Sequence, residues 1–211
     1  VTRRLVSKEG GATRTARTLE VFQPVENWEG GPHSPQVIFD FTPGQADLQG
    51  YFLQIPMQVE GEVYENRGLY DARFYRNKAR AALPDILAHS IQKLGDELDP
   101  SKIEAHPIHL FSPRNNFSAE RVLLVGDAAG VDPLLGEGIG PALGYGVVAA
   151  KSIQQAFERS DFSFHPYRRQ LMLSSVGRYL LIRYSIARIG YRYSHSPMFM
   201  RAFWRAAALV E

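Results

Sequence analysis

Two groups of small residues carry the strongest chemical signal in the sequence. The first is Gly126-Asp127-Ala128-Ala129-Gly130, and the second is Gly136-Glu137-Gly138-Ile139-Gly140. Glycine permits positive φ angles and lets a ligand touch the main chain. A helix that begins directly after such a group points unpaired N–H groups at negative charge on a ligand. The two groups therefore predict a backbone that approaches a ligand closely, with Asp127 as the carboxylate beside it.

The elements that flank these groups are predicted to be a strand and a helix. Residues 122–125 form a continuous apolar run, which is typical of a strand buried on both faces. Beyond the second group, an apolar stripe at helical spacing comprises Ala142, Leu143, Val147, Val148 and Ile153. A strand, a small-residue loop and a helix start favour a cofactor site. The alternative is an αβ turn in which Asp127 caps the helix, and that arrangement needs no ligand.

The run from Gly126 to Ile139 resembles a motif of the FAD-dependent oxidoreductases. GDAAG and then PLLGEGI, followed by a helix, is similar to the second FAD-contacting motif of the aromatic hydroxylases, flavin-dependent halogenases and geranylgeranyl reductases. The reductase-like branch fits best. In that family the aspartate holds a ribityl hydroxyl, and the helix start serves the pyrophosphate and the flavin ring. The resemblance implies FAD contacts at these positions: Gly126, Asp127, Ala128, Pro133, Gly136, Glu137, Gly138 and Ile139.

Glu137 keeps two roles open, because it could contact the flavin side or orient the loop through main-chain hydrogen bonds. A complete enzyme of this family also carries a GxGxxG loop on its first strand, and residues 10–11 are the only glycine pair near the start of this sequence. Residues 1–4 (VTRR) are similar to the end of a V-x-R-R stretch of the family. The resemblance therefore implies the C-terminal part of a longer enzyme, with a missing N-terminal segment that holds the dinucleotide loop. A short protein that begins with a basic segment is the alternative.

The first half of the sequence predicts short strands joined by turns, which indicates an antiparallel sheet. The strands are expected at 17–23, 36–42, 50–56, 62–74 and 102–111, and a helix at 83–94 with Ile86, Leu87, Ile91 and Leu94 as its buried stripe. Tyr51, Leu53 and Ile55 share one face of their strand. Their stretch lies where the reductase family has an aromatic-x-Trp-x-Phe-Pro motif that lines the substrate cavity. The resemblance implies a substrate cavity lined by these residues, and ordinary sheet core is the alternative.

The last fifty residues are basic and aromatic. Between residues 162 and 211 eight arginines face a single acid, Glu211. We expect two helices, broken near residues 194–197. They either pack their apolar faces on the enzyme or make a peripheral membrane contact through residues 165–209.

These patterns predict four parts and an α+β fold. Residues 1–16 end the N-terminal FAD-domain segment, 17–112 form an antiparallel-sheet substrate domain, 113–160 are the FAD-binding strand-loop-helix, and 161–211 are the basic helices. The fold class is an α/β FAD-binding element plus an antiparallel sheet, with a helical C-terminus. It corresponds to a partial FAD/NAD(P)-binding fold that lacks its N-terminal Rossmann segment.

Composition restricts the function further. The 211 residues contain no cysteine, which excludes disulfides and thiolate nucleophiles, and the sequence indicates no metal site. The sequence has no run of eighteen apolar residues and no signal-peptide pattern. A net charge of +2 without a recognition motif does not support binding to nucleic acid. We therefore expect a cytoplasmic or membrane-peripheral protein.

The resemblance implies an FAD-dependent oxidoreductase, reductase-like or monooxygenase-like, that acts on a hydrophobic or aromatic small molecule. Electrons would come from NAD(P)H or from a carrier protein. No catalytic side chain is identified, because in flavoenzymes the cofactor supplies the reactive group. The alternatives are a non-catalytic binding module and a membrane-associated isoprenoid-lipid reductase.

Overall fold

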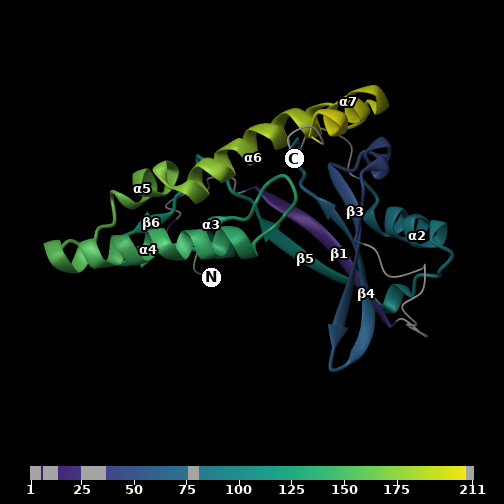
Figure 1. Ribbon diagram of the computed structural model, residues 1–211, viewed down its shortest axis with the longest axis horizontal. Coiled ribbons are helices and arrows are strands. Elements are labelled where there is room, and N and C mark those ends of the chain that lie inside the picture. Colours follow the sequence, from purple (N-terminus) through teal and green to yellow (C-terminus); the bar gives the residue numbers. More distant parts are fainter. Residues whose placement is uncertain (1–5, 7–13, 25–36, 76–80, 208–211) are drawn as a thin grey trace. The chain divides into compact units, whose positions relative to one another are not determined.

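The computed structural model describes residues 6, 14–24, 37–75 and 81–207, and Figure 1 labels their elements. The motif at residues 1–4 lies outside the described residues. The chain divides into two compact units. The first comprises Val1–Ala16 and Ile108–Ile189, and the second comprises Arg17–Pro107 and Gly190–Glu211.

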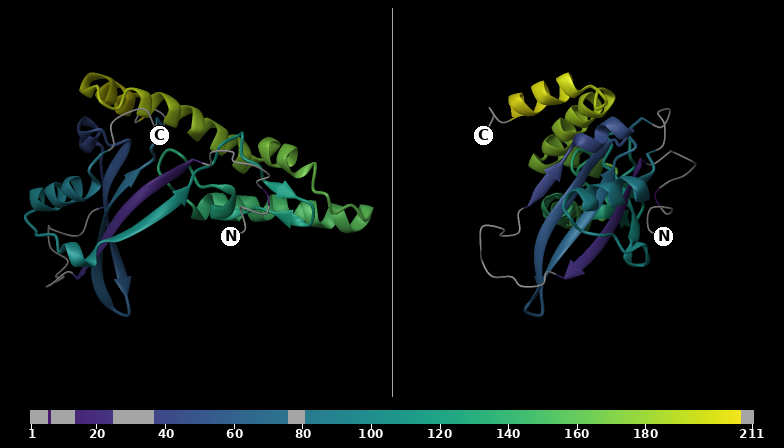
Figure 2. Two further views of the ribbon diagram at one scale, coloured as in Figure 1. Left: turned by 180° about the vertical axis from the view of Figure 1, so that it is seen from behind. Right: turned by 90° about the vertical axis from the view of Figure 1, so that its right-hand side faces the viewer.

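A five-stranded sheet forms the framework of the second unit. In chain order its strands are β1 (Thr15–Pro24), β2 (Ile38–Asp40), β3 (Gly50–Val59), β4 (Glu62–Asp71) and β5 (Glu104–His109). Their order across the sheet is β2-β3-β4-β1-β5, with β2, β3, β4 and β1 paired antiparallel. Figure 2 shows β3 and β4 as a long hairpin. The predicted antiparallel sheet is confirmed.

Three predicted strands, at 36–42, 62–74 and 102–111, are longer than the observed β2, β4 and β5. β2 ends at Asp40 because the chain turns there into the 3-10 helix η1 (Thr42–Ala46), and the Asp40 carboxylate accepts the Thr42 N–H at 2.8 Å. β5 begins only at Glu104, since the 3-10 helix η2 (Pro100–Lys102) precedes it. Local side-chain hydrogen bonds of this kind compete with strand formation.

Helix α2 (Leu83–Lys93) covers one face of the sheet. The pairing sets Leu19, Leu69 and Phe52 side by side on that face, and they share a core with Leu87 and Ile91. The predicted stripe of α2 was partly wrong. Leu83 is buried in place of Leu94, which is the exposed C-cap, and Ile86 is only partly buried. The stripe starts one turn earlier because the helix already packs on the sheet from its first residue.

The first unit holds the short strands β6 (Ser118–Ala119) and β7 (Val122–Leu123), followed by α3 (Gly126–Ala129), α4 (Ile139–Arg159) and α5 (Tyr167–Leu173). The prediction of a strand buried on both faces at 122–125 was wrong. Within the described chain β7 pairs with β6 alone, and Val125 is exposed. Leu124 is buried, so the apolar run reflects a core contact of this one residue and not a central strand.

Helix α4 was predicted to begin after the second glycine group, and it begins within that group, at Ile139 (Figure 1). Of the apolar stripe that the sequence predicted for α4, only Val148 lies on the buried face of the helix. The buried positions are Pro141, Tyr145, Val148, Ala149, Ser152 and Ala156. In contrast, Ile139, Leu143 and Phe157 are 82%, 72% and 70% exposed. The helix is apolar nearly all round, so hydrophobic spacing alone did not fix which side packs inward.

The basic C-terminal segment forms three helices and not two. A break near residues 194–197 is present, because α6 (Ser175–Arg192) ends before it and α7 (Pro197–Ala207) begins at its proline. A further break separates α5 from α6 at Ser174, whose backbone is extended and whose Oγ accepts the Gly177 N–H at 3.1 Å. Among the described residues, none of the helices has the length and apolarity needed to span a bilayer.

Candidate functional site

The two glycine groups meet at the start of α4, within the first unit. A Cβ atom added to Gly138 would lie 3.0 Å from Oδ1 of Asp127, so the aspartate carboxylate of the first group lies against the main chain of the second. Asp127 is exposed, and its carboxylate accepts no hydrogen bond from the described residues. The alternative in which Asp127 caps a helix therefore finds no support in the described contacts. The carboxylate is available to a ligand.

Four hydrogen bonds hold the backbone before and after Asp127. The Tyr167 hydroxyl donates to the Leu124 carbonyl at 3.0 Å, and the Tyr145 hydroxyl donates to the Gly130 carbonyl at 2.9 Å. The Phe111 N–H donates to the Val131 carbonyl and the Val131 N–H to the His109 carbonyl, each at 2.9 Å. Both tyrosines are fully buried. α3 is therefore held between rigid anchors, although it is a single turn.

The glycines of the site have different structural reasons. Gly136 has a φ angle of 73°, a left-handed conformation that is strained for residues with a side chain. A Cβ on Gly130 would lie 2.6 Å from the Phe111 nitrogen. Gly130 therefore lacks a side chain because the backbone at Phe111 packs closely against it. The sequence had suggested instead that the small residue gives access to a ligand. Gly138 differs from both, since it makes room for the Asp127 carboxylate.

Main-chain donors at the start of α4 remain available in part. Oε1 of Glu137 accepts the Gly140 N–H at 2.7 Å, so this carboxylate orients the helix start, the second of its two expected roles. The Gly136 N–H donates to the Asp132 carbonyl at 2.9 Å. In the described part of the chain no hydrogen bond engages the N–H groups of Gly138 and Ile139. These two donors and the Asp127 carboxylate form the candidate binding edge.

Sequence reasoning missed the residue that shapes the loop before α4. Asp132 is completely buried, and its carboxylate accepts the N–H groups of Leu134 and Leu135 at 2.8 and 3.2 Å. The same carboxylate binds Arg183 of α6. The Asp132-Pro133 dipeptide was the available signal, because Asp-Pro favours the start of a turn. Nothing in the sequence distinguished Arg183 from the other arginines of the basic segment.

The predicted cavity residues lie in the second unit, on the sheet face opposite α2. Tyr51 is buried, with its ring centroid 5.2 Å from Phe39 and 5.3 Å from Phe41 and Tyr70. Tyr51 is thus part of an aromatic cluster of the sheet. Leu53 and Ile55 are only partly buried. Their assignment to a substrate cavity stays a prediction.

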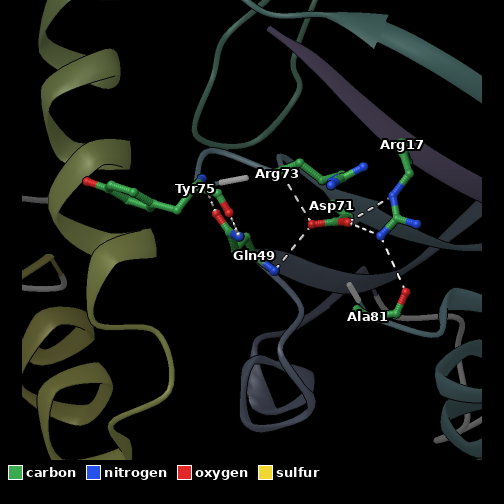
Figure 3. A network of polar contacts seen from close by, with 6 residues as sticks. All are labelled: Arg17, Gln49, Asp71, Arg73, Tyr75 and Ala81. Carbon is green, nitrogen blue, oxygen red and sulfur yellow. Dashed lines mark hydrogen bonds and ion pairs between the residues drawn. The ribbon is translucent and has the colours of Figure 1, made fainter. Parts of the chain in front are cut away.

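A second polar cluster surrounds Asp71 at the end of β4 (Figure 3). Its nearly buried carboxylate binds the Arg17 guanidinium and accepts the main-chain N–H groups of Gln49 and Arg73 at 3.4 and 3.3 Å. The Gln49 side chain is bonded in turn to both main-chain groups of Tyr75. Asp71 is therefore occupied in holding backbone segments together and is not free to act on a ligand.

A pocket of about 560 Å³ lies beside this cluster. It is lined by Arg17–Leu19 of β1, the start of α2 and residues 105–107 of β5. The lining is mainly apolar and includes none of the residues that the sequence assigned to a site. The Arg17 guanidinium at this pocket is already engaged by Asp71 and the Ala81 carbonyl.

Comparison with known proteins supports the fold. No protein-family model matches the chain. It is 31% identical over 121 residues to conditioned medium factor receptor 1 of Dictyostelium discoideum, across 56% of this chain and 22% of that protein. It is structurally similar to a geranylgeranyl bacteriochlorophyll reductase-like protein from Thermoplasma acidophilum, with a TM-score of 0.60 and 18% identity, across 87% of this chain and 44% of that one.

The chain therefore spans less than half the length of either protein. At 18% identity the structural likeness concerns the fold alone. The α+β arrangement of an antiparallel sheet with helices is consistent with that of the reductase-like protein. This agrees, at the level of the fold, with the family that the glycine groups resemble.

Proposed function

We propose that this chain is the C-terminal part of an FAD-dependent oxidoreductase and that the start of α4 binds the flavin. One observation carries the proposal: the exposed Asp127 carboxylate, without a hydrogen-bond partner in the described chain, adjoins the free N–H groups of Gly138 and Ile139. A carboxylate beside main-chain donors suits a ligand that presents a hydroxyl and a negatively polarised edge. A ribityl chain and the pyrimidine edge of a flavin present both.

Each group then has a definite role. Asp127 accepts a hydrogen bond from a ribityl hydroxyl, and the N–H groups at the start of α4 face the pyrimidine edge, where reduction adds negative charge. FAD, when bound, supplies the electron-transfer chemistry, and the protein contributes position, electrostatics and exclusion of water. Glu137 holds the first turn of α4 through the Gly140 N–H, so that the neighbouring donors keep their direction.

The substrate we propose is a hydrophobic or aromatic small molecule, which the protein reduces or oxygenates with electrons from NAD(P)H or a carrier protein. The sheet face of Tyr51, Leu53 and Ile55 supports this choice, since two of the three side chains are only partly buried. The reductase-like branch is favoured by the name of the structurally similar protein. This protein would work in the cytoplasm or at a membrane surface.

The partner that completes the site is, in this proposal, an N-terminal segment of the same enzyme. The outward face of α4 supports it. Ile139, Leu143, Val147 and Phe157 are exposed along the length of the helix, which is more apolar surface than an isolated helix face normally leaves in water. A dinucleotide-binding segment packed on this face would lie next to Asp127, where the flavin is expected.

Substitution of Asp127 tests the proposal. In the longest natural polypeptide that contains this chain, we expect Asp127→Ala to weaken FAD binding by roughly tenfold to a hundredfold, because a charge-assisted hydrogen bond contributes about 1.5–3 kcal/mol. Fluorescence titration with FAD measures the change. Asp85→Ala is the matched control, since Asp85 is also an exposed aspartate in the first turn of a helix. Equal affinity of the Asp127→Ala and wild-type proteins would refute the assignment.

A non-catalytic binding module is the second candidate function. The sequence similarity to a protein named as a receptor favours it, across the 121 matched residues. The visible absorption spectrum separates the two candidates. A purified longer polypeptide that is yellow supports the flavoenzyme, and one that is colourless and takes up no added FAD supports the module.

A membrane-associated isoprenoid-lipid reductase is a narrower form of the main proposal. The outward face of α6 favours it, because Ile182 and Ile189 are 60% and 55% exposed among exposed arginines such as Arg178 and Arg188. An apolar strip flanked by cations is the pattern of a helix that lies on an anionic membrane surface.

A further inference from the structure

An ion pair between a fully buried aspartate and a partly exposed arginine holds the loop that leads into α4. Oδ2 of Asp132 accepts hydrogen bonds from both Nε and Nη2 of Arg183, at 3.0 and 2.6 Å. The side chain of Asp132 is 0% exposed, and its partner stands 51 residues further along the chain, on α6. Bonds between a guanidinium and a carboxylate are charge-assisted and directional. The pair therefore connects the loop firmly to a long helix.

The same aspartate also closes the loop on itself. Its N–H donates to the Glu137 carbonyl at 3.0 Å, and its carbonyl accepts the Gly136 N–H at 2.9 Å. Its carboxylate accepts the N–H groups of Leu134 and Leu135. Asp132 thus stands at the beginning of the loop and bonds to its middle and its end. The carboxylate therefore connects Arg183 to Leu134 and Leu135, while the main chain of the same residue holds Gly136 and Glu137, which lead into α4.

A turn of this kind does not by itself require a charge. The side chain of asparagine can accept main-chain N–H groups in the same way as that of aspartate. A buried carboxylate is costly unless a cation compensates it, and an apolar or neutral arrangement is often equally stable. What the charge pair adds to the turn is position: the guanidinium fixes where the Asp132 carboxylate lies.

The surroundings of Arg183 restrict its movement. Its guanidinium lies over the ring of Tyr179, 5.7 Å from the ring centroid, one helical turn earlier on α6. Burial, together with the nearby Asp132 and Glu137 carboxylates, raises the pKa of Tyr179 against the lowering effect of Arg183. The Tyr179 ring therefore offers the guanidinium a neutral aromatic face on the same helix.

We propose that Arg183 is a positioning residue for the flavin: through Asp132 it fixes residues 132–138 so that the N–H groups of Gly138 and Ile139 point at the pyrimidine edge. The inference rests on the proposed function, because it assigns a purpose to the loop that the flavin would contact. It adds to that function a residue on α6 that neither the glycine motif nor the resemblance identified. Arg183 touches neither substrate nor cofactor in this scheme.

The first test needs no cofactor. In Arg183→Gln, we expect amide hydrogen exchange at Leu134 and Leu135 to accelerate by about tenfold or more, because their acceptor is no longer held. Amides in the core, such as that of Leu171, should keep their rates. Arg178→Gln is the control, since it removes the same charge from an exposed site on the same helix. Unchanged exchange at Leu134 and Leu135 would overturn the inference.

A second variant guards against simple misfolding. Asp132→Asn combined with Arg183→Gln buries no unpaired charge, so this double variant should melt closer to the wild type than Arg183→Gln does. It should still exchange faster at Leu135, because a neutral pair holds the loop less firmly. Arg183→Lys keeps the charge without the two-pronged geometry, and we expect it to restore the exchange rates only in part.

The third measurement separates this inference from the proposed function. In the longest natural polypeptide, FAD affinity should fall by about tenfold in Arg183→Gln and remain unchanged in Arg178→Gln. If the wild type binds FAD and Arg183→Gln binds it equally well, the inference fails and the proposed function stands. If the wild type binds no FAD, the proposed function fails and the inference falls with it.

Discussion

Two aspartates five residues apart show how environment assigns different tasks to the same side chain. Asp127 is exposed and has no hydrogen-bond partner in the described chain, so its carboxylate is free for a ligand. Asp132 is buried, and all its acceptor capacity is used by the loop and by Arg183. The first can bind a ligand, and the second can only shape the protein. Both tasks are needed for a site made mainly of backbone groups.

A glycine pair gives a prediction at the residue scale. Gly136→Ala should destabilise the protein by roughly 1–2 kcal/mol, because its φ of 73° is strained for any residue with a Cβ atom. Gly146→Ala should instead stabilise it by about 0.5–1 kcal/mol, since Gly146 lies inside α4 and a Cβ there meets nothing within 4 Å. Urea unfolding measures both. If both substitutions changed the free energy of unfolding in the same direction, the explanation given for one of the two glycines would be wrong.

At the scale of elements, local signals were reliable where one pattern dominated. The spacing of apolar residues predicted the strands at 50–56 and 62–74 and the helix at 83–94, and the structure has β3, β4 and α2 there. The sequence failed where the pattern was ambiguous. The apolar run at 122–125 resembled a central strand, and the stripe of α4 was read on the wrong side, since almost every side of that helix is apolar.

Helix α6 gives the prediction at this scale. It has a buried side, which includes Leu180 and Ala187, and an outward side with Ile182 and Ile189. If the outward side binds membranes, the protein should co-sediment with vesicles that contain anionic phosphatidylserine, and less so as salt rises, because each basic residue near the surface contributes about 1 kcal/mol.

Replacing both isoleucines by serine should abolish this sedimentation, because the apolar contact is lost. The matched control is Ser185→Ala, a small change on the same outward side. If the wild type fails to sediment with vesicles, or if neither salt nor the double substitution changes its sedimentation, α6 has a purely structural role.

At the scale of the whole molecule, the outward side of α4 is the feature that the described chain does not explain. A surface helix usually presents polar residues to water. Here five large apolar side chains are exposed along one helix: Ile139, Leu143, Val147, Ile153 and Phe157. This surface is adjacent to Asp127 through the shared start of α4. The proposed N-terminal segment accounts for both observations.

A double substitution on α4 tests that account. Leu143→Gln with Val147→Gln should change the stability of this chain by no more than about 0.5 kcal/mol per site, since both side chains are exposed. In the longer polypeptide the same change should lower the melting temperature and weaken FAD binding, because the covered surface becomes polar. Val148→Ala, at a buried site of α4, should destabilise both forms by roughly 1–3 kcal/mol. A longer polypeptide indifferent to the double substitution would exclude α4 as the contact.

The sequence by itself determined the features that depend on neighbouring residues. The two glycine groups, the helix that follows the first of them and the alternating strands are local patterns, and each could be predicted from spacing. Only the tertiary structure decided which side of α4 is buried and that Asp132 pairs with Arg183. The buried side depends on what packs against the helix, and the ion pair joins residues 51 positions apart, so no local pattern contains either. The loop that we assign to the flavin is therefore encoded locally in its glycines and held in place by contacts that only folding creates.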